Sequence, residues 1–377
     1  MKKVVLVADS FKGTMSSCEI SRIVKEQILR FWPDAAVIAI PVADGGEGSV
    51  DAFLSAVGGE KVTLSVKGPY FEEIESFYGL LPDKTAIIEM AAAAGLSLAN
   101  GRLDPERTTT FGVGQLMAHA LDGGCPKIIL ALGGSCTNDG GCGAAAALGV
   151  RFLDQSGEPF VPTGKTLQNI RTIDLADLHP QIKRADVTLM CDINNPLCGE
   201  RGAAAVFAPQ KGADWAMVCR LDEGLAHLAK TVRQELGADI LTLPGAGAAG
   251  GMGGGMAAFL DARMQMGIET VLDLCGFEKA AADADLVITG EGRLDSQSLG
   301  GKVVVGVAKR AKKLGVPVIA LVGDVGDGIE AVYETGLDGV FSINRVAVPF
   351  AQAKERAPKD LADTAADLCR FLKRMGK

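Results

Sequence analysis

The 377-residue sequence contains only three histidines, His119, His179 and His227, and each stands alone in a helical or loop context. A histidine-built metal site or a Ser-His-Asp triad needs histidine beside other ligands or a nucleophile, so the sequence argues against both. The nine cysteines form no Cys-x-x-Cys pair. Cys191 and Cys198 are too far apart for common zinc spacings. We interpret all nine as reduced thiols, which predicts a cytoplasmic protein.

Excess positive charge is also missing, because 38 Lys and Arg stand against 46 Asp and Glu, a formal net charge of −8. A nucleic-acid partner is therefore not expected, although a small anion could still meet local lysines and arginines. No apolar run is long enough to cross a bilayer. The first run, residues 3–8, ends at Asp9, which is typical of a first strand and not of a secretory signal.

Glycine is abundant instead, with 48 residues, well above ordinary usage. The glycines cluster after strand-like runs and form no low-complexity tract, which indicates many turns that can approach a ligand closely. Hydrophobic residues make up 48% of the chain, enough for sizeable cores. A chain of this length predicts two domains, or one large α/β body with an insertion.

The two ends of the sequence share a parallel α/β pattern. Strands are expected over 3–8, 37–42, 286–289, 316–322 and 339–343, and helices over 18–31, 47–57, 303–314, 328–335 and 360–375. The runs 61–66, 73–80 and 84–90 alternate in polarity and are separated by Gly-Pro and Pro-Asp, which predicts antiparallel hairpins.

We therefore predict an α/β protein with a parallel-sheet, Rossmann- or flavodoxin-like domain built from residues 1–70 and 285–377. A second α/β domain with mixed strands, residues 71–284, is inserted into it. A ligand would bind in the cleft between the two domains. The alternative of three consecutive domains needs separate sheets of two or three strands at each end, and such sheets are hard to stabilise.

Acids, amides and cations recur directly after strands or before helices in both predicted domains. In open α/β sheets, such positions at the carboxyl ends of strands place ligand-binding groups. The segments are DSFKG (9–13), DGGEG (44–48), GGSCTNDGG (133–141), CDINNP (191–196), PQKG (209–212) and TGEGRLDSQS (289–298).

Two further motifs are ambiguous. Residues 245–250 fit G-x-G-x-x-G after an expected strand at 240–243, but Glu269 falls in or beyond a helix and not at the end of a second strand. We interpret this turn as a helix start with exposed amides, suited to phosphate. Thr163-Gly164-Lys165-Thr166 lacks the upstream glycine and the strand of a P-loop, so we treat it as chance.

The residue types at these positions fit phosphoryl transfer. That reaction needs a metal-held nucleotide, cations against the transferred phosphoryl group, and a carboxylate near the attacking hydroxyl. Gly-rich turns can hold nucleotide phosphates through backbone amides, and Mg²⁺ prefers carboxylates and water. Lys12 and Arg293 are the candidate anion clamps. Composition alone does not select which aspartate is the base.

The same segments, joined by PVADGGEG (41–48), CDINNPL (191–197), PQKGA (209–213) and PGAGAAGGMG (244–253), resemble the type 1 glycerate kinase family along the whole chain. The resemblance implies ATP-dependent phosphorylation of D-glycerate with Mg²⁺, in bacteria generally to 2-phospho-D-glycerate, in the breakdown of organic acids such as galactarate, glucarate or glyoxylate. A glycerate 3-kinase, giving 3-phosphoglycerate, is the alternative. Cys136 replaces the alanine more usual in GGSATNDGG, which removes no charged group.

We expect the glycerate carboxylate to meet Lys12 and Arg293, whose fork geometry matches a carboxylate. The hydroxyl would face Asp192 or Asp295 as catalytic base, and the other aspartate, with Asp44, would hold Mg²⁺. Further substrate-binding candidates are Ser10, Asp44, Glu47, Asn195, Lys211 and Gln297. Nucleotide-binding candidates are Gly133, Gly134, Ser135, Thr137, Asn138, Asp139, Gly245, Gly247, Gly250 and Glu291.

Two other classes of function stay open on the sequence. A nicotinamide-dependent dehydrogenase of a small hydroxy acid would use the turn at 245–250. A non-catalytic sensor of small acids would bind glycerate and form no ADP from ATP. The sequence does not decide between a monomer and a homo-oligomer.

Overall fold

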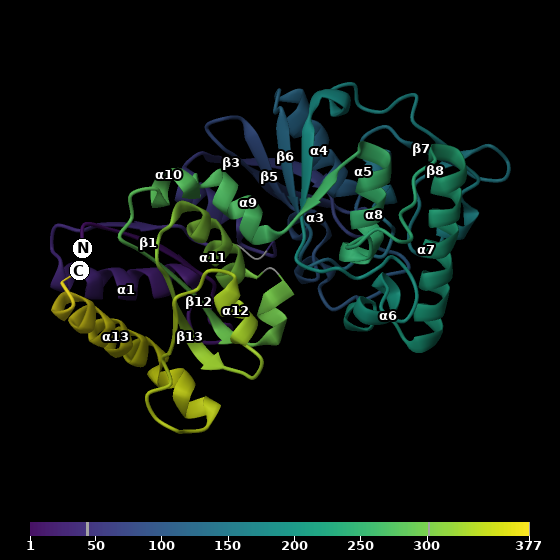
Figure 1. Cartoon of the computed structure of the whole chain (residues 1–377). Coiled ribbons are helices and arrows are strands. Elements are labelled where there is room, and N and C mark those ends of the chain that lie inside the picture. Colours follow the sequence, from purple (N-terminus) through teal and green to yellow (C-terminus); the bar gives the residue numbers. More distant parts are fainter. Residues whose placement is uncertain (43–44, 301, 377) are drawn as a thin grey trace. The chain divides into compact units, whose positions relative to one another are not determined.

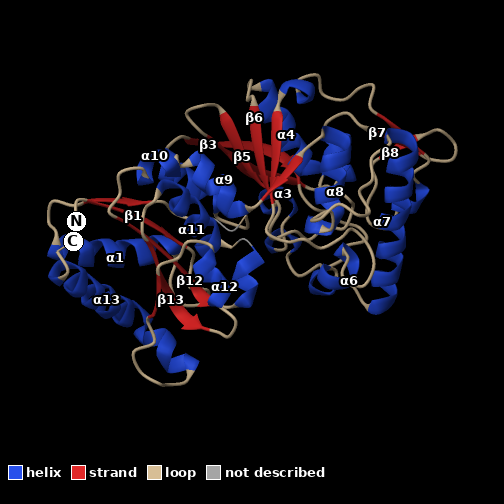
Figure 2. Ribbon diagram, viewed as in Figure 1, coloured by secondary structure: helices blue, strands red, loops and turns tan. Residues whose placement is uncertain are grey.

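The computed structural model describes residues 1–42, 45–300 and 302–376, with only the backbone of Gln297 (Figure 1). Its contacts divide the chain into two units. Met1–Asp44 and Ile268–Lys377 form the outer unit, and Gly45–Gly267 forms the middle unit. Figure 2 shows that strands and helices are mixed in both, so the predicted α/β class is confirmed.

The outer unit contains a five-stranded sheet in the order β14-β13-β12-β1-β2, and every neighbouring pair is parallel. The strands are β1 (Lys3–Ala8), β2 (Ala36–Ala39), β12 (Leu286–Leu294), β13 (Val318–Val325) and β14 (Gly339–Ser342). Since β1 pairs with β12, residues from both ends of the sequence build this sheet, as expected of a parallel α/β domain. The chain runs outward from β1 to β2 on one side and from β12 to β14 on the other. The sheet therefore has a topological switch point between β1 and β12.

Helices complete the outer unit. Helix α1 (Ser17–Phe31) begins where the sequence predicts, because the Ser16 side chain accepts the Glu19 N–H at 3.2 Å. Helix α13 (Phe350–Arg374) packs along α1 (Figure 1). Both helices share one apolar core with Val4 and Leu6 of β1. The remaining helices are α9 (Gly267–Leu274), α10 (Phe277–Ala281), α11 (Val303–Leu314) and α12 (Glu330–Glu334).

The middle unit contains a six-stranded mixed sheet in the order β11-β10-β6-β5-β4-β3. Its strands are β3 (Glu60–Lys67), β4 (Glu73–Leu80), β5 (Thr85–Glu89), β6 (Lys127–Ala131), β10 (Asp186–Met190) and β11 (Arg263–Gln265). The β3-β4 and β4-β5 pairs are antiparallel, as the alternating runs predict, and the other pairs are parallel. Ala86 and Ile88 of β5 and Ile128 and Leu130 of β6 lie in the main core of the unit.

Helices and a small second sheet surround these strands. The small sheet joins β7 (Arg151–Leu153), β8 (Pro159–Phe160) and β9 (Thr172–Asp174). The helices are α2 (Ser49–Val57), α3 (Ala91–Ala94), α4 (Phe111–Asp122), α5 (Cys142–Ala147), α6 (Ala203–Phe207), α7 (Trp215–Leu236) and α8 (Ala248–Leu260). Among the described residues, no helix combines the length and the apolar character that a bilayer crossing requires.

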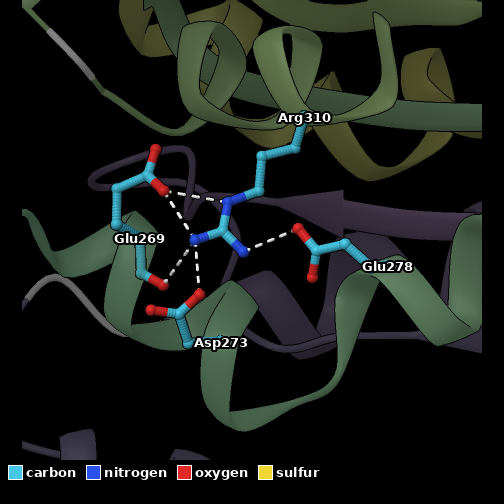
Figure 3. A network of polar contacts seen from close by, with 4 residues as sticks. All are labelled: Glu269, Asp273, Glu278 and Arg310. Carbon is cyan, nitrogen blue, oxygen red and sulfur yellow. Dashed lines mark hydrogen bonds and ion pairs between the residues drawn. The ribbon is translucent and has the colours of Figure 1, made fainter. Parts of the chain in front are cut away.

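The unit boundaries differ from the expected 70/71 and 284/285. Strand β3 pairs with β4 along its whole length, so residues 45–70 belong to the middle unit. After β11 the chain joins the outer unit, where Arg310 of α11 contacts three acids from α9 and α10 (Figure 3). Its guanidinium lies 2.7 Å from Glu269 and 2.8 Å from Glu278, and it also pairs with Asp273.

Three elements also differ from expectation. Strand β12 continues through Gly290-Glu291-Gly292-Arg293, which the sequence suggested as a turn, because Gly290 allows close approach to β13. A Cβ at Gly290 would lie 2.2 Å from the Leu321 carbonyl oxygen. Helix α13 begins ten residues earlier than expected and includes Pro358. Residues 240–243 form no strand, so the G-x-G-x-x-G turn lacks the context of a dinucleotide fold.

Candidate active site

In the outer unit, the candidate residues gather at the switch point between β1 and β12. The Asp9 N–H donates to the Gly290 carbonyl at 2.9 Å, which joins the ends of the two strands. A Cβ at Gly292 would lie 3.5 Å from the Lys12 backbone nitrogen, so the 9–13 loop passes directly over β12. A Cβ here would also lie 3.3 Å from Phe11 Cα, a tight contact, so glycine relieves crowding between β12 and the loop. The two motifs DSFKG and GEGR thus meet at the edge where ligands bind in open α/β sheets.

Arg293 and Asp295 form an ion pair at this edge. Arg293 Nε lies 3.5 Å from Asp295 Oδ2, and the arginine side chain is exposed. A Cβ at Gly326 would lie 2.8 Å from Asp295 Cβ and 3.4 Å from the guanidinium, so the loop after β13 packs against the pair. The exposed guanidinium keeps donors for an incoming anion, because a single carboxylate oxygen engages only one side of its fork.

Glu291 lies under the same edge and is only 5% exposed. Its Oε1 has no hydrogen-bond partner among the described residues. Burial raises the pKa of this carboxyl to about 7, and the Ser298 hydroxyl and Lys302 oppose the shift, while Asp9 and Asp295 add to it. The Ser298 Oγ also accepts the Asp295 N–H at 3.3 Å. Glu291 is thus linked through Ser298 to the segment that carries Asp295.

Replacing Glu291 with glutamine is expected to change how stability depends on pH. The pKa of Glu291 is higher in the folded protein than in the unfolded chain. The protonated carboxyl therefore contributes its full stabilisation below the unfolded pKa of 4.5, and this stabilisation is lost as the pH rises towards about 7. Glutamine stays neutral and avoids this loss. Relative to wild type, the variant should gain about 2–4 kcal/mol in free energy of unfolding between pH 4.5 and pH 8. Urea unfolding at several pH values measures it.

Glu73→Gln is the matched control of opposite sign. A hydrogen bond from Lys67 lowers the pKa of the exposed Glu73, so its contribution to stability is present above the unfolded pKa and is lost as pH falls. The control should therefore lose stability relative to wild type at neutral pH. A Glu291→Gln curve parallel to wild type at all pH values would contradict the assigned burial of this carboxyl.

In the middle unit, the loop 133–141 follows β6 and is anchored by the fully buried Asp139. Its carboxylate accepts the N–H groups of Thr110, Gly141 and Gly143 at 2.7, 3.0 and 3.2 Å, and the Thr110 hydroxyl at 2.8 Å. These donors lie at the starts of α4 and α5. Burial raises its pKa, and the four donors oppose the rise. Asp139 therefore caps two helices, whose N-termini favour a negative charge. Its carboxylate oxygens bind donors of the protein itself, so Asp139 supports the loop from inside.

Lys211 contacts the same loop from the short 3₁₀ turn Pro209–Lys211. Its ammonium is buried and donates to Ser135 Oγ at 2.9 Å and to the Thr137 carbonyl at 2.7 Å. Thr137 and Asn138 are fully buried, and among the described residues Thr137 Oγ1 and both side-chain polar atoms of Asn138 have no hydrogen-bond partner. Residues 135–139 of the loop are thus polar but buried, and Gly134 lies at the exposed edge of the loop.

The loop after β10 carries Asp192 and Asn195. Asp192 is exposed, and its Oδ1 accepts the Gly267 N–H at 2.6 Å. Asn195 Nδ2 donates to the Arg201 carbonyl at 2.8 Å, which fixes the turn. Asp192 therefore lies at the solvent-facing side of this loop.

The glycine-rich turn 245–250 packs between these loops. A Cβ at Gly247 would lie 2.3 Å from the Pro196 carbonyl oxygen, and one at Gly250 would lie 2.0 Å from that of Thr137. Gly245, with φ of 79°, lies against Ile193 and Met264. The Gly247 N–H donates to the Asn195 carbonyl at 3.1 Å. These residues are buried, not exposed as expected, and close contact between backbones explains why they are glycine.

Other expected residues lie around these loops. The Glu47 carboxylate accepts the Ser97 hydroxyl at 2.9 Å, and the Gly133 N–H donates to the Gly45 carbonyl at 2.7 Å, so segment 45–47 adjoins loop 133–141. Ser10 is half-buried beside Asp9. Asp44 and the side chain of Gln297 lie outside the described residues. Lys12, Arg293 and Asp295 belong to the outer unit, and Asp192 belongs to the middle unit.

Sequence reasoning missed two buried polar residues that shape these loops. Glu89 ends β5 and accepts the Val50 N–H at 2.6 Å, which caps α2 directly after the 45–48 turn, and burial raises its pKa. Thr110 supports Asp139 and also accepts the Ala144 N–H at 2.9 Å. A charged residue at the end of the apolar strand TAIIE was a signal for Glu89, whereas Thr110 carried none.

In both α/β units, parallel strands end in acids, amides and cations, which is the arrangement expected of an enzyme that binds anionic ligands at the edge of a sheet. The glycerate kinase family model matches residues 4–373, and the chain belongs to that family. It is 45% identical over 370 residues to a glycerate kinase of Halalkalibacterium halodurans, covering 98% of this chain and 97% of the relative. It is 43% identical over 343 residues to a glycerate 2-kinase of Escherichia coli K12, covering 90% of each.

The fold agrees with this family. A solved structure described as a glycerate kinase 2 from Salmonella typhimurium LT2 superposes with a TM-score of 0.86 at 42% identity. The alignment covers 100% of this chain and 99% of the other. The expected resemblance and the expected kinase class are therefore confirmed.

Proposed function

We propose that this protein transfers the γ-phosphoryl group of ATP to the 2-hydroxyl of D-glycerate and releases 2-phospho-D-glycerate and ADP. The observation that carries the proposal is the near full-length similarity to glycerate kinases, which include a glycerate 2-kinase. The exposed Arg293 and Lys12 at the switch point of the outer sheet support it, because an anionic substrate needs such cations.

In this proposal the outer unit binds the sugar acid. The glycerate carboxylate meets Arg293 and Lys12, which come from the adjoining motifs at the ends of β12 and β1. A guanidinium can hold two carboxylate oxygens in one plane and so orient the substrate. The reacting hydroxyl gives its proton to Asp192 or Asp295 as its oxygen forms the new bond to phosphorus, and ADP leaves with the electrons of the broken bond.

The middle unit holds the nucleotide through loop 133–138. Gly134 lies at the exposed edge of this loop with a φ of 78°, a conformation that lets a glycine backbone approach a phosphate closely. Asp139 and Lys211 hold the buried part of the loop in place through their hydrogen bonds to the Thr110 N–H and the Thr137 carbonyl. Gly245, Gly247 and Gly250 contribute by packing against it and against the 191–197 loop.

Mg²⁺ binds proteins through one or two carboxylates and otherwise keeps water and substrate phosphates as ligands. Within the described ranges, no three His, Cys, Asp or Glu side chains group into a cation cage. A single exposed carboxylate, such as Asp192, fits that sparse ligand set. We propose that Asp192 or Asp295 holds Mg²⁺, which would neutralise charge on the transferred phosphoryl group.

The product of the reaction tests this proposal directly. Wild-type protein, D-glycerate and MgATP should give one new phosphomonoester, and phosphorus and carbon-13 NMR should place it on C2. Because NMR reports activity and position together, 3-phosphoglycerate would replace the 2-kinase assignment by the 3-kinase alternative. No phosphomonoester from D-glycerate would reject the proposed reaction, and loss of NADH with hydroxypyruvate would favour the dehydrogenase instead.

A further inference from the structure

Lys211 is the buried cation of loop 133–141. The residue is 1% exposed, and its two hydrogen bonds reach Ser135 Oγ and the Thr137 carbonyl. Both partners lie in the part of the loop directly after the exposed edge at Gly134. An ammonium buried to this degree has no surface with which to bind a substrate.

The loop depends on contacts of this kind because its own backbone is irregular. Gly134 and Gly140 have φ values of 78° and 62°, and between them the chain forms no helix. Asp139 fixes the C-terminal end of the loop through the starts of α4 and α5. Lys211 supports residues 135–137 in the same way, because its ammonium joins the Ser135 side chain to the Thr137 carbonyl.

We propose that Lys211 is a positioning residue for the nucleotide, which holds residues 135–137 so that the loop keeps the conformation that receives the phosphates. It does not contact glycerate, which differs from the role expected from the sequence. The inference rests on the proposed function, which assigns the nucleotide to this loop. The buried positive charge also favours anionic phosphates at the exposed edge of the loop, because charges in a low-dielectric interior are weakly screened.

The charge of Lys211 adds a second signature. Burial lowers the pKa of this ammonium to about 8; Cys136 and Asp139 are the titratable groups that face it, and the Asp139 carboxylate opposes the shift. Burial holds the Cys136 thiol at a pKa of about 12, so it stays neutral over the range of interest. Nucleotide affinity should therefore fall as the pH rises through about 8, while affinity for glycerate should not follow this titration.

Two substitutions separate the hydrogen bonds from the charge. Lys211→Met removes both, whereas Lys211→Gln keeps N–H donors and removes the charge. Lys230→Met, on the exposed side of α7, is the matched control. Calorimetry measures the Kd for MgADP and for D-glycerate separately, at pH 7 and at pH 9, and thermal melting confirms that each variant is folded.

Lys211→Met should weaken MgADP about ten- to a hundredfold at pH 7, since hydrogen bonds from a charged donor are lost. Lys211→Gln should weaken MgADP binding less than Lys211→Met does. Neither variant should change the Kd for glycerate. The loss of MgADP affinity that the wild type shows between pH 7 and pH 9 should be absent in both variants. If Lys211→Met does not fold, Lys211→Gln decides alone. A weakened glycerate Kd with unchanged MgADP Kd would overturn the inference in favour of direct substrate contact.

The proposed function and this inference can fail separately. Wild-type protein that binds MgADP but makes no phosphoglycerate would reject the proposed reaction, and the Lys211 variants would still judge the positioning role through MgADP binding. Wild-type protein that binds no nucleotide, or Lys211 variants with wild-type Kd values for MgADP, would overturn the inference itself.

Discussion

Changing Asp295 or Asp192 to asparagine is expected to lower kcat with D-glycerate and MgATP by about 10²–10⁴-fold, the usual loss when a positioned acid–base group is removed. Asparagine keeps the size and the hydrogen-bonding shape of aspartate. The contact of residue 295 with Arg293 and that of residue 192 with Gly267 therefore lose the negative charge, but no cavity forms. Initial rates at saturating substrates measure the effect. Asp363→Asn, in an exposed i,i+4 pair on α13, is the control and should keep wild-type kcat.

A titration with Mg²⁺ separates the two roles that these aspartates could have. The variant that lacks a metal ligand should need more Mg²⁺ and recover part of its rate at high concentration. The variant that lacks the base should stay slow at every Mg²⁺ concentration. Wild-type kcat in both variants would reject the catalytic assignment of Asp192 and Asp295 together.

Asp139→Ala is expected to have the largest effect on stability, a loss of about 3–5 kcal/mol in free energy of unfolding. Alanine would leave the buried N–H groups of Thr110, Gly141 and Gly143, and the Thr110 hydroxyl, without an acceptor. The site is fully buried, so the donors lose their charged acceptor in a place that bulk water does not reach. Urea or guanidinium unfolding, followed by circular dichroism, measures the difference.

Asp154→Ala is the matched control for this effect. The Asp154 carboxylate accepts the N–H groups of Ser156 and Glu158 at 2.7 and 3.1 Å, but this turn is open to water. Removal should cost about 1 kcal/mol or less, since water can take over the two donors. Equal losses for the two alanine variants would show that the buried donors of Asp139 are satisfied in another way.

The sequence predicted the pairing of distant motifs well. Strand-end motifs around Lys12 and Arg293 were expected to meet in one parallel sheet, and the contact between Gly292 and the 9–13 loop confirms that they do. The reason is general: parallel strands bring their carboxyl ends to one edge, so a motif after each strand must lie there. A pattern of apolar runs was sufficient to reveal this.

The burial of polar side chains was not predictable in the same way. Lys211 and Asp139 stand in motifs as polar as those of Lys12 and Asp192, yet the first two are buried and the last two are exposed. The difference depends on which neighbouring segment covers each loop, and that is set by packing between elements far apart in the sequence. The glycines of 245–250 were expected to expose amides to phosphate, but they are buried. Close contact with Pro196 and Thr137 requires glycine as strictly as contact with a ligand does, so the sequence pattern is the same in both cases.

The discontinuous outer sheet has a consequence for synthesis on the ribosome. Strand β1 emerges near the start of translation, but its partner β12 follows only after the entire middle unit. At about 5–20 residues per second this delay lasts roughly tens of seconds. During that time the apolar strand Lys3–Ala8 has only β2 beside it, so the nascent chain presents an aggregation-prone edge that chaperones would need to shield.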